Sequence, residues 1–132
     1  MTISNKSIGN SFEAEFCELL AKNGFWAHNL AQNQTGQPAD IIAVKNGIGY
    51  LIDCKVCLND RFPFSRVEDN QECAMTVWEL GGNTNCYFAL KDSKNNVYML
   101  HYDDIQAKRL VGMRGITDFT KLQTIKEWLE EQ

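Results

Sequence analysis

Residues 38–55 read PADIIAVKNGIGYLIDCK, two apolar runs joined by Asn46-Gly47. An Asn-Gly pair between apolar runs is the strongest short-range signal for a β-hairpin. If this pair forms the whole two-residue loop, counting outward along both strands places Asp40 directly opposite Asp53. The stretch therefore predicts a strand pair with two carboxylates facing each other.

Such a carboxylate pair needs a physical reason. Cross-strand neighbours on one face have Cβ atoms roughly 5 Å apart, and like charges at that separation are destabilising. A divalent cation between Asp40 and Asp53 would supply the reason, because hard ions such as Mg²⁺ take oxygen ligands. The two-residue period of a strand also puts Lys55 on the face of Asp53. The alternative is a solvent-exposed hairpin whose acidic residues point to water, with Lys55 as a salt-bridge partner of Asp53.

Length and composition narrow the class of protein. The chain has 132 residues, of which 44% are apolar, so we expect residues 1–132 to form one domain with its own core. No apolar run approaches the ~18 residues of a membrane span, and no signal or transit peptide is apparent in the polar start. The five cysteines lack the dense spacing of a disulfide scaffold. We therefore expect reduced thiols and a cytoplasmic protein.

The net charge of −4 points away from a protein that coats nucleic acid. It does not exclude a nuclease, because affinity depends on local Lys and Arg contacts to phosphate, and part of the negative charge would belong to a metal site.

Periodicity and turn signals predict the remaining elements. Ser65 with Glu68 forms a capping-box pattern, and Gly81-Gly82 gives a stop. The expected order is a helix over about Asn5–Asn23, a short strand Phe25–Leu30, a polar loop Ala31–Pro38, hairpin strands Ala39–Lys45 and Ile48–Cys57, a loop Leu58–Ser65, a helix from Ser65 to Gly81, strands Cys86–Lys91 and Val97–Tyr102, and a terminal helix Thr117–Glu130.

This order, with its polar residues, resembles the restriction-endonuclease-like PD-(D/E)XK nucleases. Within them it resembles the Holliday junction resolvase branch, and the RecU type in particular. The resemblance is carried by Gly9 and Glu13, Pro38-Ala39-Asp40, Asp53-Cys54-Lys55, and the run from Phe62-Pro63-Phe64 to Gln71. It implies an α/β fold with a mixed central sheet flanked by helices, an α-β-β-β-α-β core. It also implies a Mg²⁺- or Mn²⁺-dependent DNA endonuclease, with the chemistry indicated more firmly than the substrate.

The resemblance implies roles for the residues of the hairpin. Asp40 and Asp53 would be metal ligands, and the Cys54 backbone carbonyl would complete the coordination. Lys55 would position or help deprotonate the attacking water and offset charge on the phosphate.

Two further polar residues are candidates for the site. Glu13 matches the helix carboxylate of the resolvase pattern and lies at one margin of an apolar stripe, with Glu15 at the other. We favour Glu13 as a metal ligand or a contact to metal-bound water, the alternative being a surface glutamate. Gln71 shares a helical stripe with apolar residues, so its amide is either hydrogen-bonded inside or aimed at the catalytic face. The resemblance favours the catalytic face.

DNA contact would fall to the loop after the hairpin and to the hairpin tip. Arginines suit phosphate, and exposed aromatic rings can wedge or stack against bases. The alternative is that the two loop aromatics simply hold the loop on the core. The candidate DNA-binding residues are Lys45, Arg61, Phe62, Phe64 and Arg66.

The Cys54-x-x-Cys57 spacing invites a zinc or redox interpretation, which we reject. Strand alternation puts the two thiols on opposite faces, so their sulfurs cannot meet at one ion. His28 and His101 stand alone on expected strands, and we expect structural roles for both.

The sequence thus predicts a Mg²⁺- or Mn²⁺-dependent DNA endonuclease of recombination or repair, Holliday-junction-resolvase-like, and bacterial or phage-encoded. Alternatives are a flap- or single-strand-directed or restriction-type nuclease, or a catalytically silent DNA-binding module. Symmetric cutting of a four-way junction favours a homodimer. Its candidate surfaces are the strand ending near His101 and the terminal helix with Phe119, Ile125 and Trp128, which would otherwise complete the monomer's core.

Overall fold

The computed structural model describes residues 5–30 and 37–132. The expected loop Ala31–Pro38 lies mostly outside these described residues. The elements in chain order are α1 (Asn5–Lys22), β1 (Trp26–Asn29), β2 (Ile41–Lys45), β3 (Ile48–Val56), β4 (Phe62–Pro63), the 3₁₀ turn η1 (Phe64–Arg66), α2 (Asp69–Leu80), β5 (Cys86–Lys91), β6 (Val97–His101), α3 (Tyr102–Leu110), β7 (Gly115–Ile116), the 3₁₀ turn η2 (Phe119–Lys121), β8 (Gln123–Thr124) and α4 (Ile125–Glu131).

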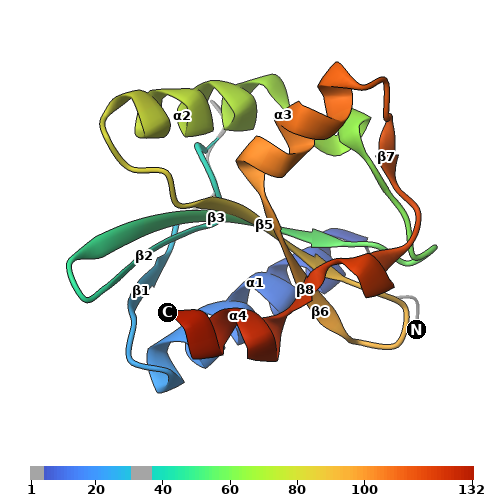
Figure 1. Ribbon diagram of the computed structural model, residues 1–132. Coiled ribbons are helices and arrows are strands. Elements are labelled where there is room, and N and C mark those ends of the chain that lie inside the picture. Colours follow the sequence, from blue (N-terminus) through green and yellow to red (C-terminus); the bar gives the residue numbers. More distant parts are fainter. Residues whose placement is uncertain (1–4, 31–36) are drawn as a thin grey trace.

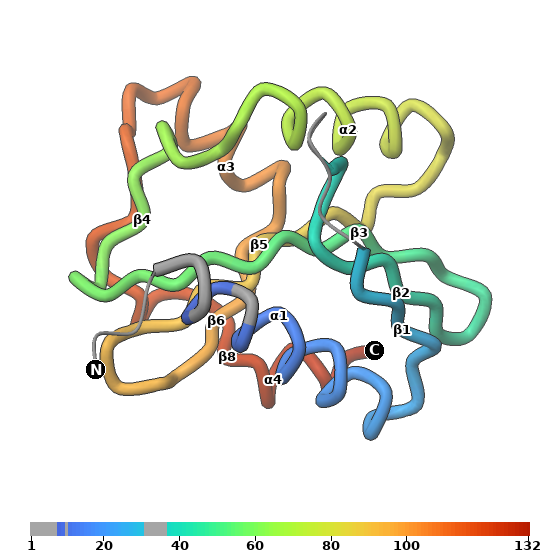
Figure 2. The backbone as a smooth tube through the Cα atoms, turned by 180° about the vertical axis from the view of Figure 1, so that it is seen from behind, coloured from blue at the N-terminus to red at the C-terminus, as the bar shows by residue number. Residues whose placement is uncertain are grey.

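A six-stranded mixed sheet forms the middle layer, in the order β1-β2-β3-β5-β6-β8. The strands β3 and β5 run parallel, and the other neighbours are antiparallel. Two parallel strands need a crossover connection, which α2 supplies. Helices cover both faces, α1 and α4 on one and α2 and α3 on the other (Figure 1 and Figure 2). The predicted fold class, a mixed central sheet flanked by helices, is confirmed.

The core is divided in two because both faces of the sheet are covered. One cluster joins Phe12, Phe16 and Leu20 of α1 to the sheet and to Trp128 of α4. The other cluster joins the opposite face of the sheet to Met75 of α2 and to α3, and extends under β4 and η1. Strand β3 separates the two clusters, and all of its residues from Tyr50 to Lys55 are buried.

The second helix begins later than the sequence predicts. Ser65 does not cap it but lies within η1, beside the buried ring of Phe64. The cap is Glu68, whose side chain and that of Gln71 satisfy each other's backbone N–H groups in a capping box. The pattern of two polar residues three positions apart was therefore correct in kind but displaced by three residues.

The predicted terminal helix Thr117–Glu130 is wrong in its first half. Phe119 and Leu122 pack in the cluster with α3, whereas Ile125 and Leu129 pack in the cluster with α1. Because these clusters lie on opposite faces of the sheet, one straight helix cannot serve both. The chain instead passes the sheet edge as β8 and starts a new helix there, capped by a box between Thr124 and Glu127.

Helix α3 was not among the elements predicted from the sequence. His101 caps this helix by accepting a hydrogen bond from the Asp103 backbone N–H, at 2.9 Å. Asp103 and Asp104 lie in its first turn and Lys108 and Arg109 in its last. This charge order complements the helix dipole and was available in the sequence.

Candidate active site

The hairpin brings Asp40 and Asp53 together at the middle of the sheet. Its register is the predicted one, from Lys45 opposite Ile48 to Ile41 opposite Ile52. Asp40 lies one residue beyond this ladder, where its backbone N–H donates to the Ile52 carbonyl at 3.2 Å. Its side chain turns toward β3, so that Oδ2 accepts a hydrogen bond from the Cys54 backbone N–H at 2.8 Å. The two carboxylates therefore meet beside the end of the ladder rather than as a ladder pair.

Asp53 is the most deeply buried charged group of the site, with 1% of its surface exposed. Its Oδ1 has no hydrogen-bond partner among the described residues. Lys55 Nζ lies 3.1 Å from Asp53 Oδ2, as an ion pair that is itself buried. Burial raises the pKa of Asp53 well above its usual value, the charge of Lys55 opposes this, and the neighbouring Asp40 reinforces it. The alternative of an exposed hairpin with acidic residues in water is wrong, whereas the alternative salt bridge between Lys55 and Asp53 is present.

Helix α1 adds Glu13 and not Glu15. Glu13 is 8% exposed, whereas Glu15 is exposed and pairs with Lys91 at 3.3 Å. Burial of Glu13 raises its pKa from 4.5 to about 7, helped by the negative charge of Asp40 and a hydrogen bond between the two side chains. Glu13, Asp40 and Asp53 thus form a chain of interacting carboxyl groups.

These groups open into a cleft of about 340 Å³ between α1, the hairpin and the start of α2. Gln71 lines it, as predicted for the catalytic face, but its Oε1 also accepts a hydrogen bond from the Glu68 backbone N–H at 3.1 Å. The predicted polar residues on its wall are Glu13, Asp40, Asp53, Cys54, Lys55, Arg66 and Gln71.

Sequence reasoning missed two amides of this cleft, Gln37 and Asn70. Gln37 Nε2 donates to Asp40 Oδ1 at 2.8 Å, and Asn70 Nδ2 donates to the Gln37 backbone carbonyl at 2.7 Å. The three-residue separation of Gln37 and Asp40 was a signal that could have suggested the first contact. Nothing local in the sequence indicates the second, which joins residues 33 positions apart.

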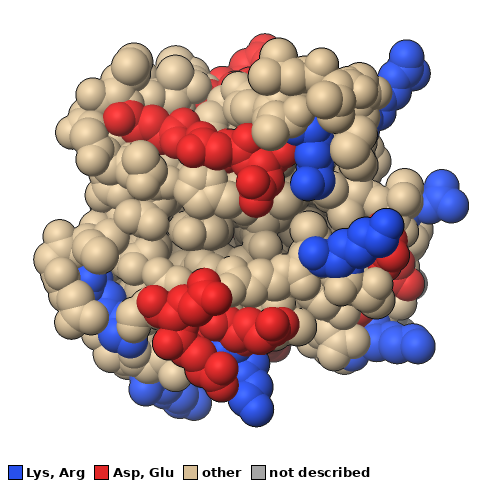
Figure 3. Space-filling view, viewed as in Figure 1, with Lys and Arg blue, Asp and Glu red and all other residues tan. Residues whose placement is uncertain are grey.

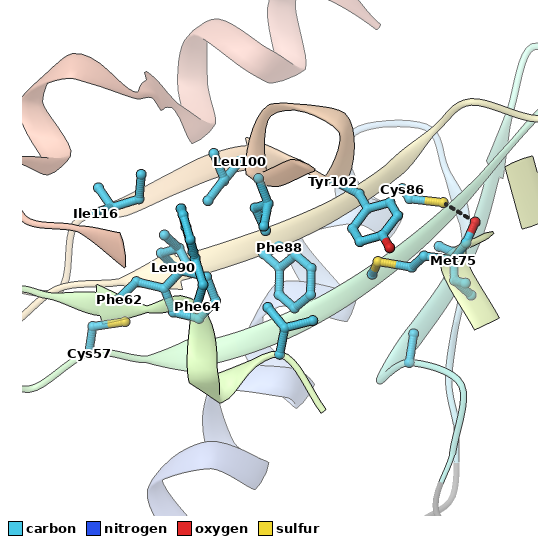
Figure 4. Close-up of a cluster of buried hydrophobic side chains, with 14 of the residues drawn as sticks. Cys57, Phe62, Phe64, Met75, Cys86, Phe88, Leu90, Leu100, Tyr102 and Ile116 are labelled. Carbon is cyan, nitrogen blue, oxygen red and sulfur yellow. Dashed lines mark hydrogen bonds between the residues drawn. The ribbon is translucent and has the colours of Figure 1, made fainter. Parts of the chain in front are cut away.

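The predicted DNA contacts divide into two groups. Phe62 and Phe64 are buried, and Figure 4 shows their rings inside the cluster with Phe88 and Leu90, so they hold the loop on the core and do not face DNA. Arg61 and Arg66 are exposed, and Arg66 lies on the wall of the cleft.

Lys45, the predicted contact at the hairpin tip, makes a cation–π contact within the protein. Its ammonium lies 5.1 Å from the centre of the Phe25 ring. On the face shown in Figure 3, acidic side chains gather over α2 and α3 and over α4, and most basic ones lie along the margins.

The cysteine and histidine interpretations agree with the structure. Cys54 and Cys57 belong to the two core clusters on opposite faces of the sheet, so they cannot share an ion. His28 is exposed and stacks on Trp26, while His101 caps α3. All five cysteines are free.

The residues of the cleft fit a hard divalent cation of the Mg²⁺ type. Within the described ranges, no three His, Cys, Asp or Glu side chains are gathered as a preformed cage. Mg²⁺ does not require one, because it is usually held by one or two carboxylates, with waters and substrate phosphate completing its shell. The buried Asp53 Oδ1, which has no hydrogen-bond partner among the described residues, is the observation that fits such an ion.

A sequence model described as the archaeal Holliday junction resolvase (Hjc) family matches residues 4–131. The chain belongs to this family. The predicted Holliday junction resolvase branch is thereby confirmed, and with it the class of structure-specific recombination nucleases. The RecU-type refinement stays a prediction, and a bacterial or phage origin gains no support because the family is described as archaeal.

Among solved structures, the fold is similar to Hjc from Archaeoglobus fulgidus, described as a Holliday junction resolvase from an archaeal hyperthermophile. The TM-score is 0.69 at 19% identity, over 92% of this chain and 97% of that chain. No curated protein shows a significant match. Among the described helices of this family member, none is long and apolar enough to cross a membrane.

The raised pKa of Glu13 predicts a pH dependence of stability. Because the folded pKa is about 7 against an ordinary 4.5, the folded state holds more protons than the unfolded chain between these values. The contribution of protonated Glu13 to the free energy of unfolding is fully present below about pH 4.5 and is lost as pH rises through 7. The raised pKa of Asp53 gives a change of the same sign. Without divalent ions, we expect Glu13→Gln to reduce the fall in unfolding free energy between pH 5 and pH 8 by on the order of 1 kcal/mol.

Urea unfolding of wild type and variant at both pH values measures this difference. Glu130→Gln, an exposed change on α4 outside the cleft, is the matched control and should follow wild type. A Glu13→Gln variant with the same pH dependence as wild type would contradict the assignment.

Proposed function

We propose that this protein is a Mg²⁺- or Mn²⁺-dependent endonuclease that cuts four-way DNA junctions, and that residues 1–132 are one nuclease domain. The observation that carries the proposal is the buried group of Asp40, Asp53 and Lys55 at the wall of an open cleft, in a chain that belongs to a resolvase family. Maintaining two carboxylates and an ammonium without bulk water is costly for folding. A catalytic role accounts for that cost.

Each residue of the group has a distinct task. Asp40, Asp53 and the Cys54 carbonyl would hold the cation, with Glu13 beside them. The cation supplies charge stabilisation at the phosphate and lowers the pKa of a bound water. Lys55, fixed by its ion pair with Asp53, places a positive charge where negative charge develops on the phosphodiester. The pKa of Glu13 is about 7 in the metal-free protein, and a cation bound beside it would lower this pKa and favour the carboxylate.

Substrate backbone would be bound by exposed arginines near the cleft. Arg66 Nη1 donates to the Val56 carbonyl at 2.9 Å, which holds the guanidinium in place and leaves its other N–H groups for phosphate. Arg61 is exposed on the same segment. Phe62 and Phe64 are excluded from base stacking by their burial.

Metal binding is tested through stability. If the cation relieves the charge repulsion of Asp40 and Asp53, millimolar Mg²⁺ or Mn²⁺ should raise the melting temperature by ligand linkage. Asp53→Asn should reduce this rise, because it removes one charged ligand. Calorimetric titration gives the affinity directly, and wild-type protein that binds neither ion, with and without DNA, would refute the site.

Cleavage is tested with labelled four-way junctions, flaps, single strands and duplexes in Mg²⁺. Lys55→Met keeps the length of the stem but removes the charge, so we expect junction binding to persist and cleavage to fall by about 10²–10³-fold. Gln71→Ala should reduce the cleavage rate by a smaller factor. Lys126→Met, on the exposed side of α4, is the matched control. Equal rates for wild type and Lys55→Met would contradict the mechanism, and cutting of flaps or single strands alone would favour the alternative nuclease.

We also propose that the working unit is a homodimer, because a four-way junction requires two symmetric cuts and each chain supplies one such group of residues. The predicted contact surface needs correction, since Phe119 and Trp128 are 5% and 1% exposed and complete the monomer's core. Sedimentation at micromolar concentration should give twice the chain mass of 15.0 kDa. A monomer both alone and with junction DNA would overturn this.

A further inference from the structure

The side chain of Gln37 connects a proposed metal ligand to the opposite wall of the cleft. Its Nε2 donates to Asp40 Oδ1 at 2.8 Å. Its backbone carbonyl accepts a hydrogen bond from Asn70 Nδ2 at 2.7 Å. Asn70 lies in the first turn of α2, directly before Gln71. These two contacts therefore join α2 to the Asp40 carboxylate through one residue.

The two carboxylates of the site are held very differently. Asp40 accepts a hydrogen bond on each oxygen, from Gln37 on Oδ1 and from the Cys54 backbone N–H on Oδ2. Asp53 has the Lys55 ammonium 3.1 Å from Oδ2 and no hydrogen-bond partner for Oδ1 among the described residues. The backbone donor is fixed by β3, so the orientation of the Asp40 carboxylate depends on the side chains beside it, Gln37 on Oδ1 and Glu13.

The orientation of the Gln37 amide follows from its partner. A carboxylate can only accept hydrogen bonds, so the amide nitrogen must face Asp40. The amide oxygen is then left buried on the cleft side, with no donor among the described residues. A buried acceptor without a donor is unfavourable in a folded protein, and a water bound in the cleft would satisfy it.

We propose that Gln37 is a positioning residue that orients Asp40 for the cation, and that Asn70 fixes Gln37 in turn. The proposal rests on the cation site at Asp40 and Asp53. It makes the start of α2 part of the support of that site. Partners that orient a metal ligand affect metal affinity even though they do not touch the metal.

A purely structural role would have different consequences. If Gln37 and Asn70 served only to attach α2 to the hairpin, their removal would lower the melting temperature and leave the affinity for the cation unchanged in the folded protein. If Gln37 orients Asp40, its removal weakens cation binding, and a high cation concentration restores cleavage.

The test uses Mn²⁺ as the probe and the full chain. Gln37→Met keeps the length of the side chain and removes the amide. Calorimetric titration without DNA should show a dissociation constant for Mn²⁺ raised by about tenfold or more. The Mn²⁺ concentration that gives half-maximal junction cleavage should rise by the same factor, while the maximal rate at saturating Mn²⁺ stays close to wild type. Asn70→Ala, a change at an exposed residue, should raise the dissociation constant for Mn²⁺ by a smaller factor.

The matched control is Gln123→Met on β8, at the far edge of the sheet, which should leave the Mn²⁺ affinity unchanged. If Gln37→Met fails to fold, Asn70→Ala decides the question by the same titration. Unchanged Mn²⁺ affinity in the folded Gln37 and Asn70 variants, with an active wild type, overturns the positioning role and leaves the proposed function intact. A wild type that neither binds Mn²⁺ nor cuts DNA overturns both.

Discussion

The ion pair of Asp53 and Lys55 inside strand β3 is the constraint on which the rest of the structure depends. The two charged atoms lie 3.1 Å apart on a strand that is covered on both faces. Attraction within a buried pair is largely offset by the loss of hydration, so the pair adds little net stability. The apolar clusters on the two faces of the sheet must therefore supply the stability that this ion pair does not.

The two core clusters supply this stability from both faces of the sheet. Strand β3 contributes Ile52 and Cys54 to the cluster with α1, and Leu51 to the cluster with α2 and α3. Each face thus contributes apolar contacts next to the charged residues. Phe62 of β4 and Phe64 of η1 pack in the cluster with α2 and α3. They therefore belong to the core, although their position beside exposed arginines suggested DNA contact. Burial there keeps the segment fixed against the sheet while Arg66 reaches the cleft.

The parts of the molecule that sequence reasoning predicted correctly are those specified by local patterns. The Asn-Gly turn determines the hairpin register by itself, and the two-residue period of a strand then orders Asp53 and Lys55. The errors occur where distant packing decides. The stripe from Phe119 to Leu129 has helical spacing, but its two halves serve opposite faces of the sheet, which no local pattern reveals. The contact of Asn70 with Gln37 likewise depends on how α2 crosses over the sheet.

The charge balance of the cleft connects metal binding to DNA binding. Its wall carries the carboxyl groups of Glu13, Asp40, Asp53 and Glu68 against the cationic groups of Lys55 and Arg66. Without a cation, the ionised carboxylates would repel a phosphate at this position, in keeping with the net charge of −4 for the whole chain. A divalent cation becomes the largest local charge in such a site and reverses the field that a phosphate meets. Because phosphate oxygens also complete the shell of a Mg²⁺ ion, cation and DNA should each strengthen the binding of the other. An acidic nuclease can therefore bind DNA at the place where it cuts, without the basic surface that a non-catalytic DNA-binding protein would need.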